Sequence, residues 1–277
     1  MSVRFKEENH SYESITDENI SWISVTSFIG QFKEPFDAKG MANKCSKNKK
    51  SKWFGLTPQQ IEEAWSSEAK RSTDLGSWYH NQREADLVSH TTLVRDGFTL
   101  PIIKPIYDQG IKIAPDQKLS DGIYPEHFVY LKSAGICGQS DLVEVVNGVV
   151  NITDYKTNKE IKKEGFKNWE GIAKKLSNPV HHLDDCNFNH YTLQLSMYLY
   201  IILKHNPKLK PGKLTLHHII FEEQDRDVYD NPIYKLDDNK NFIVKEVIPY
   251  ELPYLKAECI SLINWLKDNR DKIKKKH

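Results

Sequence analysis

Apolar and polar residues alternate most clearly on either side of Asn147 and Gly148. An Asn-Gly pair between two valine-rich runs predicts a β-hairpin with a type I′ turn, because both central residues of that turn need positive φ. Such a turn makes Val146 face Val149 and fixes the register of both strands. Because side chains alternate along a strand, one face of the hairpin carries a set of apolar residues: Val143, Val145, Val150 and Ile152.

The same register brings charged residues together. Counting outward from the turn places Asp141 directly opposite Asp154, and Lys156 lies on the same face as Asp154. Cross-strand neighbours are about 4.5–5.5 Å apart, where two carboxylates repel each other unless something compensates. A divalent cation beside a lysine supplies that compensation, because hard cations prefer carboxylate oxygens. The hairpin therefore predicts a metal site, with a plain surface cluster of charges as the alternative interpretation.

The remaining pattern predicts an α/β protein in which helices flank a mixed sheet. Thr57 to Gln60 form a capping box with proline at the first helical position, so a helix begins there and runs to about Arg71. A second helix starts at Thr73 or Asp74 and runs to about Val88. A strand ahead of the hairpin completes an antiparallel meander, and two helices and two strands follow it: strand Glu126–Lys132, helix Tyr191–Lys204, strands Lys213–Phe221 and Phe242–Tyr250, and a closing helix from Pro253 to about Lys272.

Three segments lack such a pattern. Residues 1–56 are expected to form an irregular N-terminal region that packs on a core made of residues 57–277. Residues 91–125 are rich in glycine and proline, which indicates a loop-rich connection with room for one short helix. Residues 157–189 are expected to be an insertion in the core, with a short helical piece near Ile172 to Leu176.

Composition narrows the class of protein without naming a function. The chain has 277 residues, of which 39% are hydrophobic and 28% charged, and this is typical of a globular protein. Its net charge is only +1, so a surface for nucleic acid must come from local clusters of lysine. Two such clusters exist, and each is either a nucleic-acid contact or a solvated face: Lys44, Lys47, Lys49, Lys50 and Lys52, and Lys159, Lys162, Lys163 and Lys167.

Cysteine and histidine add one further metal candidate. The four cysteines are scattered without a Cys-x-x-Cys pair, so neither a disulfide nor a zinc knuckle is expected. His181, His182, Cys186 and His190 lie close in sequence and have a spacing that a metal site or a polar loop would share, and we favour the loop. The chain has no apolar run of membrane-spanning length and no targeting signal, so we expect a cytoplasmic protein without a membrane partner.

Two short motifs resemble a known family. Gly138-x-x-Asp141 on one strand, followed by Asp154-x-Lys156 on the next, is similar to the PD-(D/E)XK nuclease superfamily, and in particular to its RecB-like exonuclease branch. Ser140 stands where the superfamily's name has proline, but the RecB-like branch usually shows Gly-x-x-Asp at this point. The segment Ser24 to Ile29 also resembles one that precedes the core of phage exonucleases and of the mitochondrial genome maintenance exonuclease.

The resemblance implies a fold, a cofactor and a set of site residues. The fold would be restriction-endonuclease-like, and the cofactor Mg²⁺ or Mn²⁺ held by Asp141, Asp154 and the backbone carbonyl of Tyr155. Lys156 would orient or help to deprotonate the attacking water. Only Cys259 lies in the C-terminal region where some relatives bind an iron–sulfur cluster, so no cluster is expected. Four further residues match the branch by motif or position: His80 and Glu126 as metal ligands, and Gln194 and Tyr198 as supports of the site that contact the substrate.

The expected function is metal-dependent hydrolysis of DNA in replication, recombination or repair. An exonuclease acting on DNA ends or single strands is favoured, because the chain has no separate sequence-reading module and no Walker A motif of a helicase motor. The alternatives are a structure-specific or restriction-type endonuclease and an inactive DNA-binding recombination accessory protein. Five tryptophans lie near the lysine clusters, and one or two of them are expected to stack on bases: Trp22, Trp53, Trp65, Trp78 and Trp169.

Overall fold

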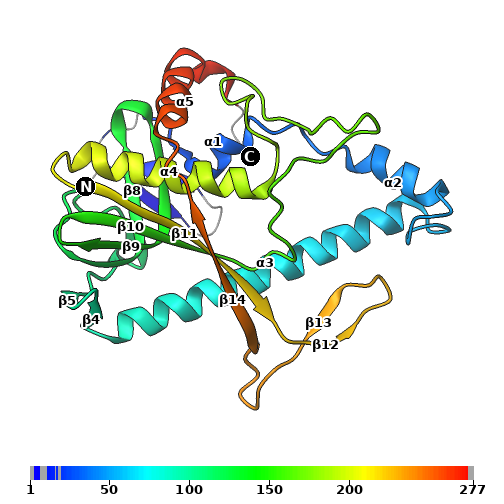
Figure 1. Ribbon diagram of the computed structural model, residues 1–277, viewed down its shortest axis with the longest axis horizontal. Helices are drawn as coiled ribbons and strands as arrows, with labels where there is room; N and C mark the ends of the chain where they lie inside the picture. Colours follow the sequence, from blue (N-terminus) through cyan, green and yellow to red (C-terminus); the bar gives the residue numbers. More distant parts are fainter. Residues whose placement is uncertain (1–2, 7–10, 16, 18–19, 274–277) are drawn as a thin grey trace.

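The protein is mixed α/β, with helices on both faces of a mixed sheet (Figure 1). The structure is a computed structural model that describes residues 3–6, 11–15, 17 and 20–273. The central sheet has the order β14-β11-β10-β9-β3, and β8 pairs with the other edge of β9. Only β10–β11 and β3–β9 are parallel pairs in this sheet. Its strands are β3 (Ile23–Ser24), β8 (Gly122–Leu131), β9 (Ile136–Val146), β10 (Val149–Lys156), β11 (Lys210–Phe221) and β14 (Val244–Leu252).

The hairpin prediction is confirmed. Asn147 and Gly148 have φ of +48° and +74°, and Val149 pairs with Val146 as the turn requires. The pairing of β9 with β10 continues outward to Thr153 and Leu142. The valines and the isoleucine on the predicted face are at most 1% exposed and belong to the main hydrophobic cluster.

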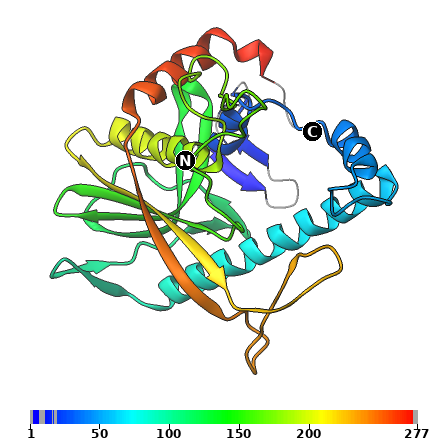
Figure 2. The same ribbon diagram turned by 45° about the vertical axis from the view of Figure 1, so that its right-hand side comes forward.

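Two long helices enclose the sheet from opposite sides (Figures 1 and 2). Helix α4 (Asn187–His205) is apolar on most sides and packs in the main cluster together with α1 (Val25–Gly30) and α5 (Lys256–Asp268). Helix α3 (Pro58–Ser89) packs on the other face, where Leu75 and Tyr79 contact Tyr155 of β10. The expected helices at 191–204 and 253–272 are thus present with shifted ends, as helix ends usually are.

The prediction of two helices between residues 57 and 88 is wrong. The capping box at Thr57 and Gln60 is present, but α3 then continues without interruption to Ser89. Thr73, the expected second start, bonds its hydroxyl to the Ala69 carbonyl one turn earlier and so stays inside the helix. Gly76 also stays inside the helix. A Cβ at this position would lie 3.4 Å from Oγ1 of Thr157.

The loop-rich interpretation of residues 91–125 is also wrong. Four short strands form two hairpins there, and no helix occurs among these residues: β4 (Thr92–Arg95), β5 (Phe98–Pro101), β6 (Ile106–Asp108) and β7 (Ile111–Ile113). Their turns are Asp96-Gly97 and Gln109-Gly110, and all four residues have positive φ. Asp-Gly between short apolar runs is a hairpin signal that was outweighed by the number of prolines nearby.

The N-terminal region is more regular than expected. It contains β1 (Val3–Lys6), β2 (Ser11–Ser14), β3, α1 and α2 (Ala38–Lys47). Strand β1 pairs with β7, and β3 pairs with β9, so this region joins two sheets of the remaining chain. In the insertion, residues 172–176 form no helix but take part in isolated bridges. A further hairpin, β12 (Glu223–Arg226) with β13 (Pro232–Tyr234), was not expected.

No helix among the described residues has the length and apolar character that crossing a membrane requires.

The turn of the central hairpin is held from outside by one aspartate. Asp121 accepts hydrogen bonds from the backbone N–H groups of Asn147 and Gly148, at 3.1 and 3.0 Å. Asp121→Ala is expected to lower the free energy of unfolding by about 1–2 kcal/mol, because two charge-assisted hydrogen bonds are lost at an exposed site. Urea denaturation measures the change. The matched control is Asp238→Ala, at an exposed residue of another turn that lacks positive φ, and an equal loss in both variants would contradict a special role for Asp121.

Candidate metal and active site

Three carboxylates form a row across adjacent strands of the sheet. The residues before and after Glu126 on β8 pair with those after and before Asp141 on β9, which places Glu126 beside Asp141. Continuing the β9–β10 register by one pair brings Asp154 to the other side of Asp141. The backbone N–H of Tyr155 donates a 2.8 Å hydrogen bond to Oδ2 of Asp141, so Asp141 lies against β10. Like charges on neighbouring strands repel, so the row needs compensation.

The backbone of β8 is distorted where the row begins. Glu126 has a φ of +47°, a conformation that side-chain-bearing residues rarely adopt and that is confined elsewhere, among the described residues, to turns and loops. The distortion interrupts the alternation of side chains, since Tyr124 and Val129 both enter the main cluster although they are five positions apart, an odd offset. Strand β9 shows the same interruption between Ile136 and Val143. Such strain in mid-strand is typical of functional sites.

His80 of α3 contacts both β9 and β10. Its Nδ1 lies 3.3 Å from Oδ2 of Asp141, and its Nε2 lies 3.0 Å from the carbonyl oxygen of Tyr155. Burial alone would lower the pKa of His80, but the Asp141 carboxylate outweighs burial and raises it to about 9. In return, His80 holds the pKa of Asp141 below its usual value in spite of burial. An imidazolium therefore bridges two groups that the sequence assigned to a metal.

Asp154 is paired with Lys156 on the same strand. Nζ of Lys156 lies 2.6 Å from Oδ2 of Asp154, whose side chain is only 2% exposed. Neither oxygen of Asp154 has a hydrogen bond of regular geometry within the described part of the chain. Burial raises the pKa of Asp154 to about 6, against the lowering effect of Lys156. The pKa of Lys156 is raised by Asp154 and Asp141, which outweigh its burial, so Lys156 is an ammonium.

The outer end of the row has its own cation. Lys112 of β7 is 7% exposed, and its Nζ lies 3.9 Å from Glu126 and 3.6 Å from Glu84 of α3. Burial and the neighbouring Asp141 together raise the pKa of Glu126 to about 8. The sequence analysis missed Lys112 and Glu84, because a single lysine in a short strand and a glutamate in a polar helix carry no signal of their own.

The residues fit a hard divalent cation. Ligand atoms of His80, Glu126 and Asp141 lie within 4.8 Å of one another, and no other such group of three occurs among the described residues. The two carboxylates supply the oxygen ligands that Mg²⁺ and Mn²⁺ prefer, the imidazole adds one softer nitrogen, and the Tyr155 carbonyl adjoins the group through His80. Asp154, predicted as a ligand, lies outside this group and contacts Lys156 instead. Its buried oxygens without hydrogen bonds remain suited to a cation.

Gly138 of β9, the strand that carries Asp141, packs against Tyr198 of α4. A Cβ at position 138 would lie 2.8 Å from Cε1 of Tyr198, so only glycine lets β9 approach α4 this closely. Gln194 donates a 3.2 Å hydrogen bond to the Tyr198 hydroxyl, one helical turn away. Tyr198 is 3% exposed and lies between Gly138 of β9 and Gln194 of its own helix.

A basic cleft opens beside the row. Its volume is about 730 Å³, and it lies between α3, the segment that follows β10, and the β12–β13 hairpin. His80, Tyr155 and Lys156 form its floor. Its wall cations come from α3 and from the insertion: Arg71, Lys159 and Lys162. Two acids of the same lining pair with them, Glu68 with Arg71 and Lys159 and Glu160 with Lys162, and the cations remain in excess.

Two other sequence candidates behave differently. His182 lies 3.0 Å from Glu258, His190 at the start of α4 lies 2.8 Å from Asp185, and Cys186 is buried, so these side chains contact different partners. Of the five tryptophans, Trp53 is 9% exposed and three others pack against hydrophobic clusters. Trp169 alone among them is freely exposed, at 91%.

No family model, no curated protein and no solved structure matches this chain. The site is therefore interpreted from its own geometry and chemistry.

Without a divalent cation, the protein is expected to lose stability as the pH rises from 6.5 to 9. Between about pH 7 and 8 the unfolded chain has released most of the protons of Glu126 and His80, whose ordinary pKa values are 4.5 and 6.5, while the folded protein, with pKa values of about 8 and 9, still holds most of them. The folded state then binds more protons, so the free energy of unfolding falls, by about 1 kcal/mol or more per pH unit. Urea denaturation at several pH values measures this slope.

Addition of Mg²⁺ is expected to reverse the trend. A cation binds the deprotonated carboxylates, so its stabilising effect grows with pH. Melting temperatures with Mg²⁺ and with EDTA at pH 6.5 and 8.5 measure the difference, and Asp141→Asn should abolish it. A shift equally large at both pH values, or retained in Asp141→Asn, would place the bound cation elsewhere.

Proposed function

We propose that this protein is a Mg²⁺- or Mn²⁺-dependent DNA nuclease of the PD-(D/E)XK type, related to the RecB-like exonuclease branch. The observation that carries the proposal is the row of Glu126, Asp141 and Asp154 with its partners Lys156 and His80, which line a basic cleft beside the row. A buried row of acids has no structural benefit of its own, because each carboxylate loses its hydration and repels its neighbour.

The chemistry of phosphodiester hydrolysis matches these groups. The reaction needs a nucleophile at neutral pH and positive charge near the phosphoryl oxygens, and a divalent cation held by His80, Glu126 and Asp141 supplies both. Lys156 is held as an ammonium by Asp154, so it acts by stabilising negative charge and by orienting water rather than by taking up a proton. Tyr191 covers this ammonium with its ring at 5.1 Å.

The arrangement of elements also supports a restriction-endonuclease-like core. A long helix, an antiparallel meander, a second long helix and a parallel strand follow one another, and the Asp and Asp-x-Lys positions lie on the meander. Gly138 and the pair Gln194 and Tyr198 occupy places where the motifs of the RecB-like branch would support β9.

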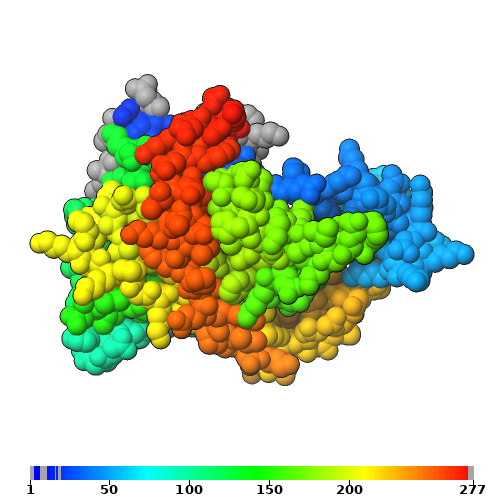
Figure 3. Space-filling model, turned by 45° about the horizontal axis from the view of Figure 1, so that its top comes forward, coloured from blue at the N-terminus to red at the C-terminus, as the bar shows by residue number. Residues whose placement is uncertain are grey.

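A path for a nucleic-acid strand leads from the cleft along the insertion. Lys162 lines the basic cleft and also a second hollow of about 560 Å³, which Lys33 and Lys167 line as well. Phe166, 81% exposed, also lines this hollow, and Trp169, 91% exposed, lies in the turn that the Lys167–Ala173 bridge closes. The segment projects from the surface toward α2 (Figure 3), where the first lysine cluster is exposed. Lysines with exposed aromatic rings are a common surface for single strands.

Loss of one acid of the row is expected to abolish cleavage. Asp141→Asn and Asp154→Asn should each lower the metal-dependent cleavage rate by at least about a hundredfold, because charge stabilisation in the transition state is lost. Glu144→Gln is the matched control, since Glu144 lies on the same strand and pairs with Arg95 away from the row. Gel assays with linear DNA and Mg²⁺, with EDTA as blank, measure the rate. Full activity in either aspartate variant would refute the assignment.

End dependence is the second part of the proposal. A cleft walled by α3 and the insertion admits a strand from its end, so linear single-stranded DNA should disappear while a covalently closed circle of the same sequence survives. Both substrates are incubated with Mg²⁺ and compared over time. Equal degradation of both would make the protein an endonuclease, and retention of both without cleavage would leave it a DNA-binding accessory protein.

A further inference from the structure

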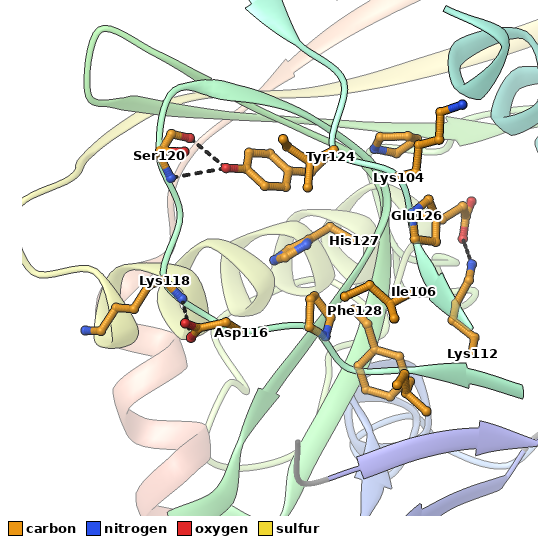
Figure 4. Close-up of a pocket in the computed structure, with 15 residues that line it drawn as sticks. Lys104, Ile106, Lys112, Asp116, Lys118, Ser120, Tyr124, Glu126, His127 and Phe128 are labelled. Atoms are coloured by element: carbon orange, nitrogen blue, oxygen red, sulfur yellow. Dashed lines mark hydrogen bonds and ion pairs between the residues drawn. The ribbon is translucent and has the colours of Figure 1, made fainter. Parts of the chain in front are cut away.

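A second cavity lies on the far side of the acidic row. It has a volume of about 280 Å³ and is enclosed by β8 and by the segment from Ile103 to Ser120 (Figure 4). Its walls are mostly apolar and include three prolines, which make the enclosing backbone stiff: Ile103, Pro105, Ile106, Ile113, Pro115 and Pro125. Lys104 and Lys118 are exposed at its edge.

One buried polar side chain in this cavity lacks a partner. His127 is 4% exposed, points into the cavity between Tyr124 and Phe128, and contacts the Tyr124 ring edge-on at 5.4 Å. Its Nε2 has no hydrogen-bond partner within the described part of the chain. An unmade hydrogen bond on a buried group costs free energy, and a ligand with a polar edge would remove that cost.

The cavity and the basic cleft meet at the metal-binding group. Glu126 lines the cavity and His80 lines the cleft, and their ligand atoms lie within 4.8 Å of each other. A phosphodiester held at this group would therefore have one nucleotide in the cleft and the next one at the cavity. Lys112, which also lines the cavity, lies beside Glu126 and is placed for the sugar–phosphate.

We propose that this cavity binds the base of the terminal nucleotide of a DNA strand. A nucleobase is flat, has apolar faces that fit the proline and isoleucine walls, and has a polar edge that can bond to the His127 imidazole. The proline-containing segment borders the pocket, and Ile103 and Ile106, which are 41% and 40% exposed, lie at its mouth, so the pocket has room for one base. The proposal rests on the proposed nuclease function. It adds the pocket that would recognise the end of a DNA strand.

Binding without cleavage tests the pocket directly. Thymidine 5′- and 3′-monophosphate, and 2-deoxyribose 5-phosphate as a probe without a base, are titrated in EDTA while the imidazole ¹⁵N signals are recorded. At least one of the two thymidine monophosphates should bind at least about tenfold more tightly than the sugar phosphate. A tenfold difference in affinity corresponds to one good hydrogen bond together with packing of the base. Its binding should also shift the signal of His127.

Two variants separate the pocket from the fold. His127→Phe keeps a buried ring and removes the polar atom, and Ile106→Trp fills the mouth from a residue that is 40% exposed. Both should lose the tenfold preference for the base and keep the melting temperature. The control is Val247→Trp, which adds the same ring on β14 at a residue of similar exposure, 41%. Equal binding with and without a base, or a preference unchanged in both variants, would overturn the proposal.

Cleavage assays keep this test distinct from that of the function. On linear single strands with Mg²⁺, an abasic residue at the recognised end should slow wild-type cleavage about tenfold, and His127→Phe should be insensitive to it. Absence of any cleavage by the wild-type protein would refute the nuclease function while the binding result still decides the pocket. Cleavage that ignores the terminal base in the wild type would refute the pocket and leave the nuclease intact.

Discussion

Repulsion within a row of carboxylates is the constraint on which the site depends. Glu126, Asp141 and Asp154 come from three neighbouring strands, and their side chains are 17%, 11% and 2% exposed, so water screens them only in part. Each carboxylate of the row has one cation beside it: Lys112 beside Glu126, His80 beside Asp141 and Lys156 beside Asp154. These cations arise from three different elements, and their positions fix how β7, α3 and β10 meet. The fold around the site is therefore organised by charge as much as by apolar packing.

Sequence patterns predicted the elements whose signals are local. The Asn147-Gly148 turn and the apolar helix α4 were placed correctly, because turn geometry and helical periodicity act over a few residues. The continuity of α3 was missed, since Thr73 is a good capping residue in isolation and only packing of Leu75 and Tyr79 against β10 keeps the helix intact. Strands β6 and β7 were missed because β1, from the distant N-terminus, completes their sheet.

The candidate site was predictable in part for the same reason. Asp141, Asp154 and Lys156 follow from one hairpin, and their neighbourhood is present. The grouping of His80, Glu126 and Asp141 depends on a left-handed residue in mid-strand and on a helix from the other face, neither of which has a local signature. Lys112 shows the limit most clearly, because its role exists only through the pairing of β1, β6 and β7 that brings it under Glu126.

The turn between β8 and β9 gives the chain an order of assembly. Strands β8, β9 and β10 follow one another directly, so the meander requires only short loop closures and can form early. The carbonyls of Ala134 and Gly135 in its first turn are bonded by residues from near both ends of the chain: Gly135 accepts from Ile23, and both accept from Arg270. These contacts have the largest sequence separations at the site, and they close late. During synthesis on the ribosome, the acidic row is thus assembled before the C-terminal helix can fasten the turn beneath it.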